Sequence, residues 1–490
     1  MSWEPSRATA LWLLAALFAL GCAIRFASLG QQSFHHDEVI TVGRVIPGSF
    51  AHMLGEVKRS ESNPPLYYVL AWGWAKALGT GELGVRSLPA IFGAATVLLG
   101  YGIGRELAGR RAGLIAAALI AVNPMLIWYS QEARSYALLV FFCAASLLFF
   151  CRALRRRDAV DLALWALASA LALCSHYFAV FAVGIEALWL LVALRDRWRA
   201  VLPAVAGVGL VGLALVPLIA AQVNPAHIGW IDEAPLSSRV FQTGVSFLIG
   251  ETGHVIAEPP REHYALLPVI LVASALLLLA LRGGRAERRG AALGGAIGLG
   301  VVGPALAAAL AGKDYVVERN LLPALVPLIV AVAIGFAAER GRRLGLLLAV
   351  ALCAYWIAFD IHVTQTPNLQ RPDYRAIAGE LGPPRGRRAI VAWKLAADPL
   401  RFYLRDHSRR VYSGETPVRQ LDVISKSTVA RPAGIPRGFR RVARVRFERL
   451  TLTRYMSKRA RLVPFYVLRR VRIGFGAVAV VADSPAWSRS

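Results

Sequence analysis

The chain has 490 residues, of which 56% are hydrophobic, and its mean hydropathy of +0.51 excludes an ordinary soluble domain. Its formal net charge is +26. Such basicity indicates membrane topology and anionic lipid head groups before nucleic acid, for which the sequence carries no binding motif. Apolar runs of about 17 to 22 residues recur between residues 8 and 360, each long enough to cross a bilayer. The sequence therefore predicts a polytopic α-helical membrane protein.

The first apolar run, residues 8–27, has no small-residue cleavage signal after it, and further runs follow. We interpret it as a retained membrane helix rather than a signal peptide. The loop after it has few charges but contains His35, His36, Asp37 and Glu38 in succession. Two adjacent carboxylates near a membrane surface are costly, which points to a functional role once their side of the membrane is known.

Five short loops between the apolar runs are dense in arginine, which places them in the cytoplasm under the positive-inside rule. They span residues 105–111, 152–157, 195–199, 282–289 and 340–343. Each pair of runs between two such loops must leave the cytoplasm and return, so the linker within each pair is extracytoplasmic. This register predicts eleven spans, a cytoplasmic N-terminus and an extracytoplasmic C-terminus.

Residues 64–80 also look like a span by hydropathy. If they crossed together with residues 87–104, the loop at residues 30–63 would lie in the cytoplasm and the N-terminus would lie outside. With the N-terminus inside, the segment must instead lie along the outer interface, where Trp72 and Trp74 favour the head-group level. We therefore predict an interfacial helix within an extracytoplasmic loop at residues 30–86.

Residues 361–490 differ in character from the rest of the chain, with 27 basic and 8 acidic residues. Residues 388–393 and 477–482 are typical of strands, and residues 374–381 and 399–404 of helices. The segment is long enough for a small extracytoplasmic α/β domain, since long domains are exported largely regardless of charge. Its charge suggests that it meets an anionic polymer or anionic lipid. We thus expect a transmembrane domain at residues 1–360 and this basic domain at residues 361–490.

The predicted topology gathers unusual polar residues on the outer face. The set comprises Asp37, Glu38, Glu61, Asn63, Arg86, Gln131, Glu132, Arg134, His176, Lys313, Asp314, Glu318 and Arg319. Each has an ordinary alternative: a solvated loop for the carboxylate pair, a snorkelling arginine, a helix-end histidine, or a cap near Glu132. Their concentration on one face favours a single functional site.

These residues suit group transfer from a lipid phosphate. Asp37 can take a proton from an acceptor hydroxyl as general base, and arginines can hold a phosphate leaving group through bidentate hydrogen bonds. An activated sugar phosphate already has a good leaving group, so one base with cationic stabilisation suffices. Direct in-line attack would invert the anomeric centre, unlike the retaining mechanism that uses two carboxylates.

Several segments together carry a family resemblance: the Asp37-Glu38 pair, NPPLYY, VRSLPAIFG, GRRAGLIAA and NPMLIWYSQEARSYAL. In this order they closely resemble membrane glycosyltransferases of the GT-C superfamily. The most similar groups are bacterial relatives of protein O-mannosyltransferases and of the aminoarabinose transferases that modify lipid A. SHYFAVF, ERNLLPALVPL and PDYRAIAGEL are similar to later blocks, so the resemblance covers about residues 8–405.

The resemblance implies a glycosyltransferase of the hexosyl or pentosyl class, mannosyltransferase-like, in the plasma membrane. It implies a polyprenyl-phosphate sugar as donor and a protein, lipid or cell-envelope glycan as acceptor. In that pattern the first acidic residue of the pair is the catalytic base, which carries over to Asp37, while Glu38 helps to position the acceptor. Arg86 and Arg134 match basic positions assigned to the donor phosphate. The remaining predicted donor- or substrate-binding residues are Asn63, Glu132, His176 and Arg319.

The sequence departs from both groups at one motif. Aminoarabinose transferases have E-K-P-P, whose Glu helps to bind metal, where this chain has Ser62-Asn63-Pro64-Pro65, with Glu61 one position away. The pattern therefore requires no cofactor, and it does not exclude a divalent metal ion. Protein O-mannosyltransferases have H-P-P at this point, and their extra lumenal domain is missing here.

Two alternatives come from other functional classes. A transporter or flippase of lipid-linked anions would share basic residues near lipid phosphate. It should also show internal repeats and polar residues at the membrane midplane, which the sequence does not. A catalytically inactive scaffold is disfavoured because Asp37 and Glu132 are intact.

Overall fold

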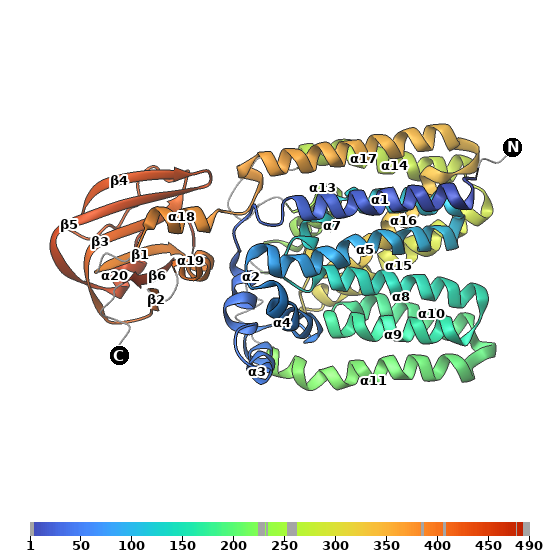
Figure 1. Ribbon diagram of the computed structural model, residues 1–490, viewed down its shortest axis with the longest axis horizontal. Coiled ribbons are helices and arrows are strands. Elements are labelled where there is room, and N and C mark those ends of the chain that lie inside the picture. Colours follow the sequence, from blue (N-terminus) through green and yellow to red (C-terminus); the bar gives the residue numbers. More distant parts are fainter. Residues whose placement is uncertain are drawn as a thin grey trace. The chain divides into compact units, whose positions relative to one another are not determined.

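The computed structural model describes residues 4–223, 231, 234–251, 262–383, 387–404, 408–476 and 478–483, and it contains two compact units (Figure 1). The helical unit comprises Met1–Leu29, Val45–Glu251 and Pro260–His362. Among the described residues, the sheet unit comprises Gly30–Arg44 and the part of the chain from Val363 onwards. The division after His362 lies close to the predicted boundary at residue 360. The grouping of Gly30–Arg44 with the C-terminal part has no counterpart in the sequence analysis.

The helical unit is a bundle of long apolar helices with shorter helices at one end (Figure 1). Its α-helices are α1 Arg7–Ala27, α3 Phe50–Ser60, α4 Leu66–Leu78, α5 Glu82–Ala108, α6 Arg110–Val122, α7 Pro124–Ser130, α8 Tyr136–Arg156, α9 Ala159–Ser175, α10 Ala179–Ala193, α11 Trp198–Gln222, α13 Leu236–Ile249, α14 Glu262–Arg282, α15 Arg285–Leu310, α16 Leu325–Ala337 and α17 Arg342–Gln365. Short 3₁₀ turns at Arg195–Arg197, Glu318–Ala324 and Glu339–Gly341 lead into α11, α16 and α17.

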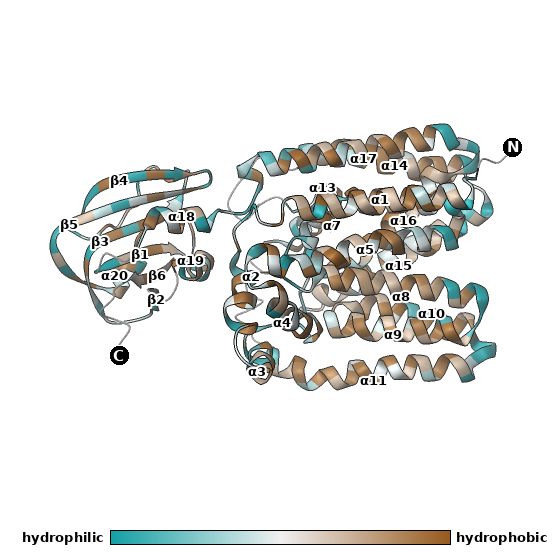
Figure 2. Cartoon of the chain, in the orientation of Figure 1, coloured by the Kyte–Doolittle hydropathy of each residue, from teal (hydrophilic) through white to brown (hydrophobic). Residues whose placement is uncertain are grey.

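Within the described residues, eight helices are long and apolar enough to cross a membrane. The bent pair of α6 and α7 makes a ninth if it is one span, and α9 and α10 are shorter apolar helices. These segments correspond one for one to the eleven predicted runs. The prediction of a polytopic α-helical protein is therefore confirmed, whereas the number of crossings and the orientation of the termini stay predictions. Hydrophilic residues collect in the loops at the ends of these helices (Figure 2).

The predicted interfacial segment forms α4, which lies with α3 at one end of the long helices (Figure 1). With 13 residues, α4 is about 20 Å long, which is short of the roughly 30 Å hydrocarbon core of a bilayer. Its length agrees with the interfacial prediction. The Trp74 indole donates to Ser87 Oγ over 2.9 Å and thereby ties α4 to the second turn of α5.

Small residues allow close helix packing within the bundle. A Cβ added to Gly104 of α5 would lie 2.8 Å from the Gly113 Cα of α6, so the two backbones touch where neither residue has a side chain. Such close contacts are the usual means of helix association in a membrane, because lipid tails are as apolar as the helices and no hydrophobic effect drives the helices together.

The sheet unit has one six-stranded sheet in the order β2-β6-β1-β3-β5-β4 (Figure 1). Its elements are α2 His36–Ile40, a π-helical turn Thr41–Val45, α18 Tyr374–Leu381, β1 Arg388–Trp393, α19 Ala397–Leu404, β2 Ser408–Val411, β3 Glu415–Lys426, β4 Arg440–Phe447, β5 Leu450–Pro464, α20 Phe465–Arg469 and β6 Val478–Asp483. Only the β1–β3 pair is parallel among the described strand pairs. The predicted small C-terminal α/β domain is confirmed, with its expected strands and helices shifted by at most two residues.

The central strand β1 is buried on both faces, which explains its unbroken apolar sequence. Ile390 and Ala392 join one core cluster, which contains α18 and α19 residues, while Ala389 and Val391 join the cluster on the opposite face. This alternation follows from the two-residue period of a strand.

Candidate active site

The predicted site residues belong to both units. Asp37 and Glu38 belong to the sheet unit. The helical unit contains the others: Asn63, Arg86, Glu132, Arg134, His176 and Arg319.

A break between α6 and α7 sets the position of the WYSQEAR segment. Asn123 caps α7 by accepting a hydrogen bond from the Leu126 amide over 3.1 Å, and Pro124 occupies the first turn. The two helices meet at 57°. Because proline has no N–H, the Ile120 carbonyl loses its helical donor, and the Arg25 Nη2 donates to it over 3.1 Å instead.

Arg25 is fully buried and also fixes the end of α7. Its Nε donates to Ser130 Oγ over 3.2 Å, while Gln131 Nε2 donates to the Arg25 carbonyl over 3.0 Å and to Ser28 Oγ over 2.7 Å. These bonds hold the end of α1 against the turn that carries Glu132 and Arg134. The sequence analysis missed Arg25, although a single arginine at the end of an apolar run followed much later by Asn-Pro is a usable signal.

Arg134 forms a buried ion pair with Glu61. The Arg134 Nη1 lies 2.7 Å from Glu61 Oε2, and the Tyr68 hydroxyl donates to the same oxygen over 2.6 Å. The Arg134 guanidinium also lies 5.9 Å from the centre of the Tyr68 ring. Burial raises the pKa of the Tyr68 hydroxyl well above its usual value, so the tyrosine stays a neutral donor. This cluster joins the segment before Asn63, the start of α4 and the WYSQEAR turn.

Asn63 is buried, and its backbone is fixed from α11. The Gln222 amide donates to the Asn63 carbonyl over 3.1 Å and to the Val57 carbonyl over 2.8 Å. The Tyr177 hydroxyl donates to Gln222 Oε1 over 2.7 Å. Gln222 thus links the loop after α3 to the turn that contains His176, a contact between segments more than 100 residues apart that the sequence did not predict.

His176 lies among cationic groups. Burial, and then the charges of Arg134 and Arg319, lower the pKa of His176 to about 3, so its imidazole is neutral at physiological pH. Its Nδ1 accepts a hydrogen bond from the Phe178 amide over 3.3 Å. Three of the predicted residues, His176, Arg134 and Arg319, are therefore close enough to act on one another electrostatically.

Arg86 and Glu132 are also buried in the helical unit. The Arg86 Nη1 donates to the Leu29 carbonyl over 2.8 Å. Leu29 is the last residue of the helical unit before the segment that carries Asp37, so this bond fixes the point from which that segment departs. Glu132 lies in the turn between α7 and α8, and its carbonyl accepts from the Arg134 amide over 2.7 Å.

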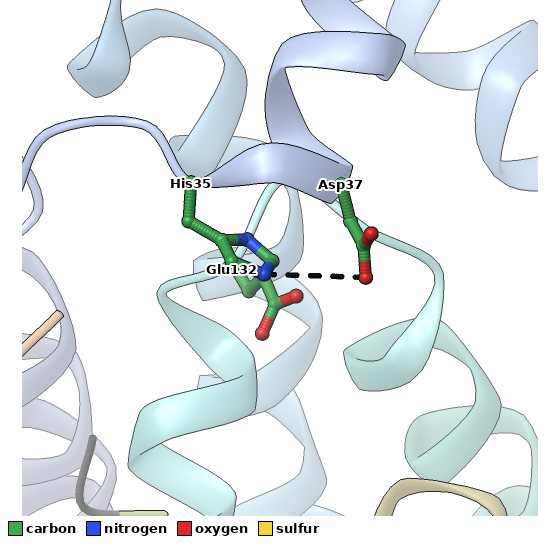
Figure 3. Close-up of side chains that lie close together, drawn as sticks. All are labelled: His35, Asp37 and Glu132. Atoms are coloured by element: carbon green, nitrogen blue, oxygen red, sulfur yellow. Dashed lines mark ion pairs between the residues drawn. The ribbon is translucent and has the colours of Figure 1, made fainter. Parts of the chain in front are cut away.

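In the sheet unit, Asp37 and Glu38 occupy the first turn of α2 but differ in environment. The Glu38 side chain is fully buried, whereas that of Asp37 is 26% exposed. The side chains of His35 and Asp37 face each other, with Nε2 4.0 Å from Oδ2 (Figure 3). Asp37 therefore combines a defined position with access to solvent.

His35 does not neutralise Asp37. Burial, and then the charge of Arg371, lower the pKa of His35 to about 3, against the opposing effect of Asp37 and Glu38. The imidazole is neutral at physiological pH, so it adds no positive charge beside the Asp37 carboxylate.

Glu61 does not suit the role of the metal-binding Glu in the E-K-P-P motif. Its Oε2 already accepts from the Arg134 guanidinium and the Tyr68 hydroxyl. A cation bound at that oxygen would have to displace a positive charge and a donor. No step of the proposed reaction is therefore assigned to a metal ion held by Glu61.

The comparisons agree with this architecture. Residues 62–220 match the family model described as dolichyl-phosphate-mannose-protein mannosyltransferase. No curated protein matches the sequence. The structure is similar to a crystal structure of ArnT from Cupriavidus metallidurans in the apo state, with a TM-score of 0.56 and 13% identity. That alignment covers 91% of this chain and 98% of ArnT.

A second crystal structure, of the same ArnT bound to undecaprenyl phosphate, gives a TM-score of 0.55 at 13% identity. It covers 90% of this chain and 97% of ArnT, so the likeness includes both units. The resemblance drawn from the sequence motifs is thus confirmed for the fold over nearly the whole length. Over nearly its whole length the chain has the fold of ArnT.

Proposed function

We propose that this protein is an integral-membrane glycosyltransferase that moves a sugar from a polyprenyl-phosphate donor to an extracytoplasmic acceptor. The fold supports this class of activity, and the match of residues 62–220 to a mannosyltransferase family supports an activated sugar as substrate. The ArnT structure bound to undecaprenyl phosphate supports a polyprenyl phosphate as the lipid carrier.

The observation that supports the proposal most is the environment of Asp37. It is a partly exposed carboxylate on a short helix, beside a neutral imidazole and next to a buried Glu38. A general base needs this combination, because it must be ionised, fixed in place and open to substrate. Glu38 is proposed to act as the neighbour that holds this geometry towards the acceptor.

The reaction balances as a single displacement. Asp37 takes the proton of the acceptor hydroxyl as its oxygen forms a bond to the anomeric carbon of the donor. The bond from that carbon to the phosphate oxygen breaks, and polyprenyl phosphate leaves with the electron pair. Attack opposite the leaving group inverts the anomeric configuration.

The helical unit supplies the groups proposed for the donor. Arg86, Arg134 and Arg319 would stabilise the charge that develops on the leaving phosphate, since guanidinium groups match phosphate geometry. Neutral His176 would serve as a hydrogen-bonding group rather than as a cation. Asn63 and Glu132 complete the proposed donor- and substrate-binding set.

The test uses the full-length protein purified in detergent. Radiolabelled undecaprenyl-phosphate mannose and undecaprenyl-phosphate aminoarabinose are offered with an extract of membranes as the source of acceptor. Transfer that depends on the donor is expected for the wild type and should fall by about 10²- to 10⁴-fold in Asp37→Asn. Full transfer activity in that variant would show that the base is assigned wrongly.

A matched control is Asp158→Asn, which makes the same change at the N-cap of α9. The Asp158 carboxylate accepts from the Asp161 amide over 2.7 Å, and asparagine can keep that bond. Its transfer rate should equal that of the wild type. Movement of the labelled lipid between leaflets without any transfer would favour a flippase instead.

A further inference from the structure

The segment that carries the Asp37-Glu38 pair packs on the C-terminal domain. Although Gly30–Arg44 lies more than 300 residues before that domain in the sequence, it forms one compact unit with Val363–Ser490. Arg375 Nη2 donates to the Gln31 carbonyl over 3.0 Å. The Ser33 hydroxyl bridges two residues there, donating to the Pro372 carbonyl over 3.1 Å and accepting from the Tyr374 amide over 2.9 Å.

An aromatic anchor follows directly before α2. The Phe34 side chain is fully buried and packs edge-on against Phe402 of α19, with ring centres 5.6 Å apart. The Phe34 amide donates to the Tyr403 hydroxyl over 2.6 Å. The Asp398 carboxylate of α19 lies 3.5 Å from Nδ1 of His36, the first residue of α2, and 3.4 Å from the guanidinium of Arg44, which follows α2.

Between these anchors, Arg371 reaches Glu38. Its Nη1 lies 3.6 Å from Glu38 Oε2, with the Arg371 side chain only 11% exposed and that of Glu38 fully buried. The same Glu38 oxygen accepts a hydrogen bond from the His35 amide over 3.2 Å. Arg371 therefore holds the carboxylate that closes the first turn of α2, and Asp37 lies in that turn.

The length of α2 makes these contacts decisive. A helix of five residues has no stability of its own in water, because forming its first turn costs more than its few hydrogen bonds return. The direction in which Asp37 points must therefore be set by tertiary contacts. Those described above all come from the C-terminal domain, and Arg371 makes the one to Glu38, the residue that follows Asp37.

We propose that Arg371 is a positioning residue for transfer: it acts through Glu38 to hold α2 and aim the Asp37 carboxylate, so the C-terminal domain is part of the catalytic apparatus. This inference rests on the proposed function only in the role that it gives Asp37. Arg371 is not proposed to touch the donor or the acceptor. Its loss should therefore slow the chemical step without weakening donor binding.

The experiment compares Arg371→Gln, Arg371→Lys and Arg446→Gln in the full-length protein. Arg446 is an exposed arginine on β4 and provides the matched control. With undecaprenyl-phosphate mannose or undecaprenyl-phosphate aminoarabinose as donor, kcat of Arg371→Gln should fall by about 10- to 100-fold, because a displacement of about 1 Å costs roughly that much. Its KM for the donor should stay within about twofold. Arg371→Lys should recover most of kcat, and Arg446→Gln should match the wild type.

Hydrogen–deuterium exchange of residues 35–40 gives a readout that does not need activity. Exchange should accelerate in Arg371→Gln and stay unchanged in Arg446→Gln. If the wild type transfers neither sugar, the proposed function fails, whereas faster exchange in Arg371→Gln would still show that Arg371 holds α2. Unchanged exchange together with unchanged kcat would overturn it. A raised donor KM at normal kcat would overturn it as well, because Arg371 would then be a substrate ligand.

Discussion

The buried ion pair of Glu61 and Arg134 allows a quantitative prediction of its contribution to the free energy of unfolding. The pair lies among the residues predicted to bind the donor. The change is Glu61→Gln, which removes one negative charge but keeps the shape of the side chain and an oxygen that can accept from Tyr68. Arg134 would then keep its charge in a buried position without the carboxylate that lies 2.7 Å from it. Removal of one partner of a buried pair is costly for that reason.

The expected cost follows from the geometry. Two unit charges 2.7 Å apart attract each other by about 6 kcal/mol at an effective dielectric constant of about 20. The amide that replaces the carboxylate and the face of the Tyr68 ring retain part of this, so we expect a loss of about 3–5 kcal/mol in the free energy of unfolding. The pair of Glu56 and Arg59 on α3 is the control, because the Arg59 side chain is 71% exposed, and Glu56→Gln should cost less than about 1 kcal/mol.

The assay is denaturant unfolding of the purified protein in detergent, followed by tryptophan fluorescence, in a double-mutant cycle. Glu61→Gln, Arg134→Gln and the double variant are compared with the wild type. Because the double variant leaves no uncompensated charge, the coupling energy between the two sites should exceed about 2 kcal/mol. A Glu61→Gln variant within about 1 kcal/mol of the wild type, or a coupling energy near zero, would refute the reasoning.

Three further predictions concern pH, packing and topology. Because unfolded His176 takes up a proton near pH 6.5 and the buried folded residue does not until about pH 3, His176 alone should lower the stability by about 2 kcal/mol between pH 7 and pH 5, and the loss measured by thermal unfolding should be smaller by that amount in His176→Gln than in the wild type. Gly93→Ala places a Cβ 1.9 Å from Ser130 Oγ and should cost about 1–3 kcal/mol in denaturant unfolding, whereas Gly303→Ala, with open space around it, should not destabilise the protein. A membrane-impermeant maleimide should label Lys76→Cys on α4 from the outside, and labelling from the cytoplasm alone would contradict the interfacial prediction.

Much of the helical unit was predictable because its signal is local. Each apolar run indicates a helix by its length and composition alone. The arginine-rich loops between the runs predict the direction in which each run crosses the membrane. The same logic predicts an interfacial position for α4, and its length of 13 residues agrees with that prediction. The strand at residues 388–393 was recognisable for a similar reason, since a short apolar run between turn residues is typical of a buried strand.

The contacts that shape the site were not predictable in this way, because each joins residues far apart in the sequence. Arg25 caps a helix break almost 100 residues later, and Gln222 holds the backbone of Asn63 across 159 residues. The sequence placed Glu61 one position away from the metal-binding Glu of the E-K-P-P motif, and only the structure gives it Arg134 as a partner. Motif spacing reports which residues are present, but not which carboxylate pairs with which guanidinium.

The Asp37-Glu38 pair shows why the distinction matters for mechanism. Successive residues on a helix point about 100° apart, so two adjacent carboxylates on α2 cannot both face the same neighbour. One of them is taken up by the fold: Glu38 is buried against Arg371 and the His35 amide. The other, Asp37, stays partly exposed beside a neutral histidine.

Both residues are needed for a working base if the buried Glu38 holds the exposed Asp37 in position. In that case loss of Glu38 should resemble loss of Arg371 more than loss of Asp37. A Glu38→Gln variant that lowers kcat no further than Arg371→Gln, while Asp37→Asn lowers it much more, would separate the two roles. If Glu38→Gln and Asp37→Asn are equally inactive, while Arg371→Gln stays active, Glu38 takes part in the chemistry itself.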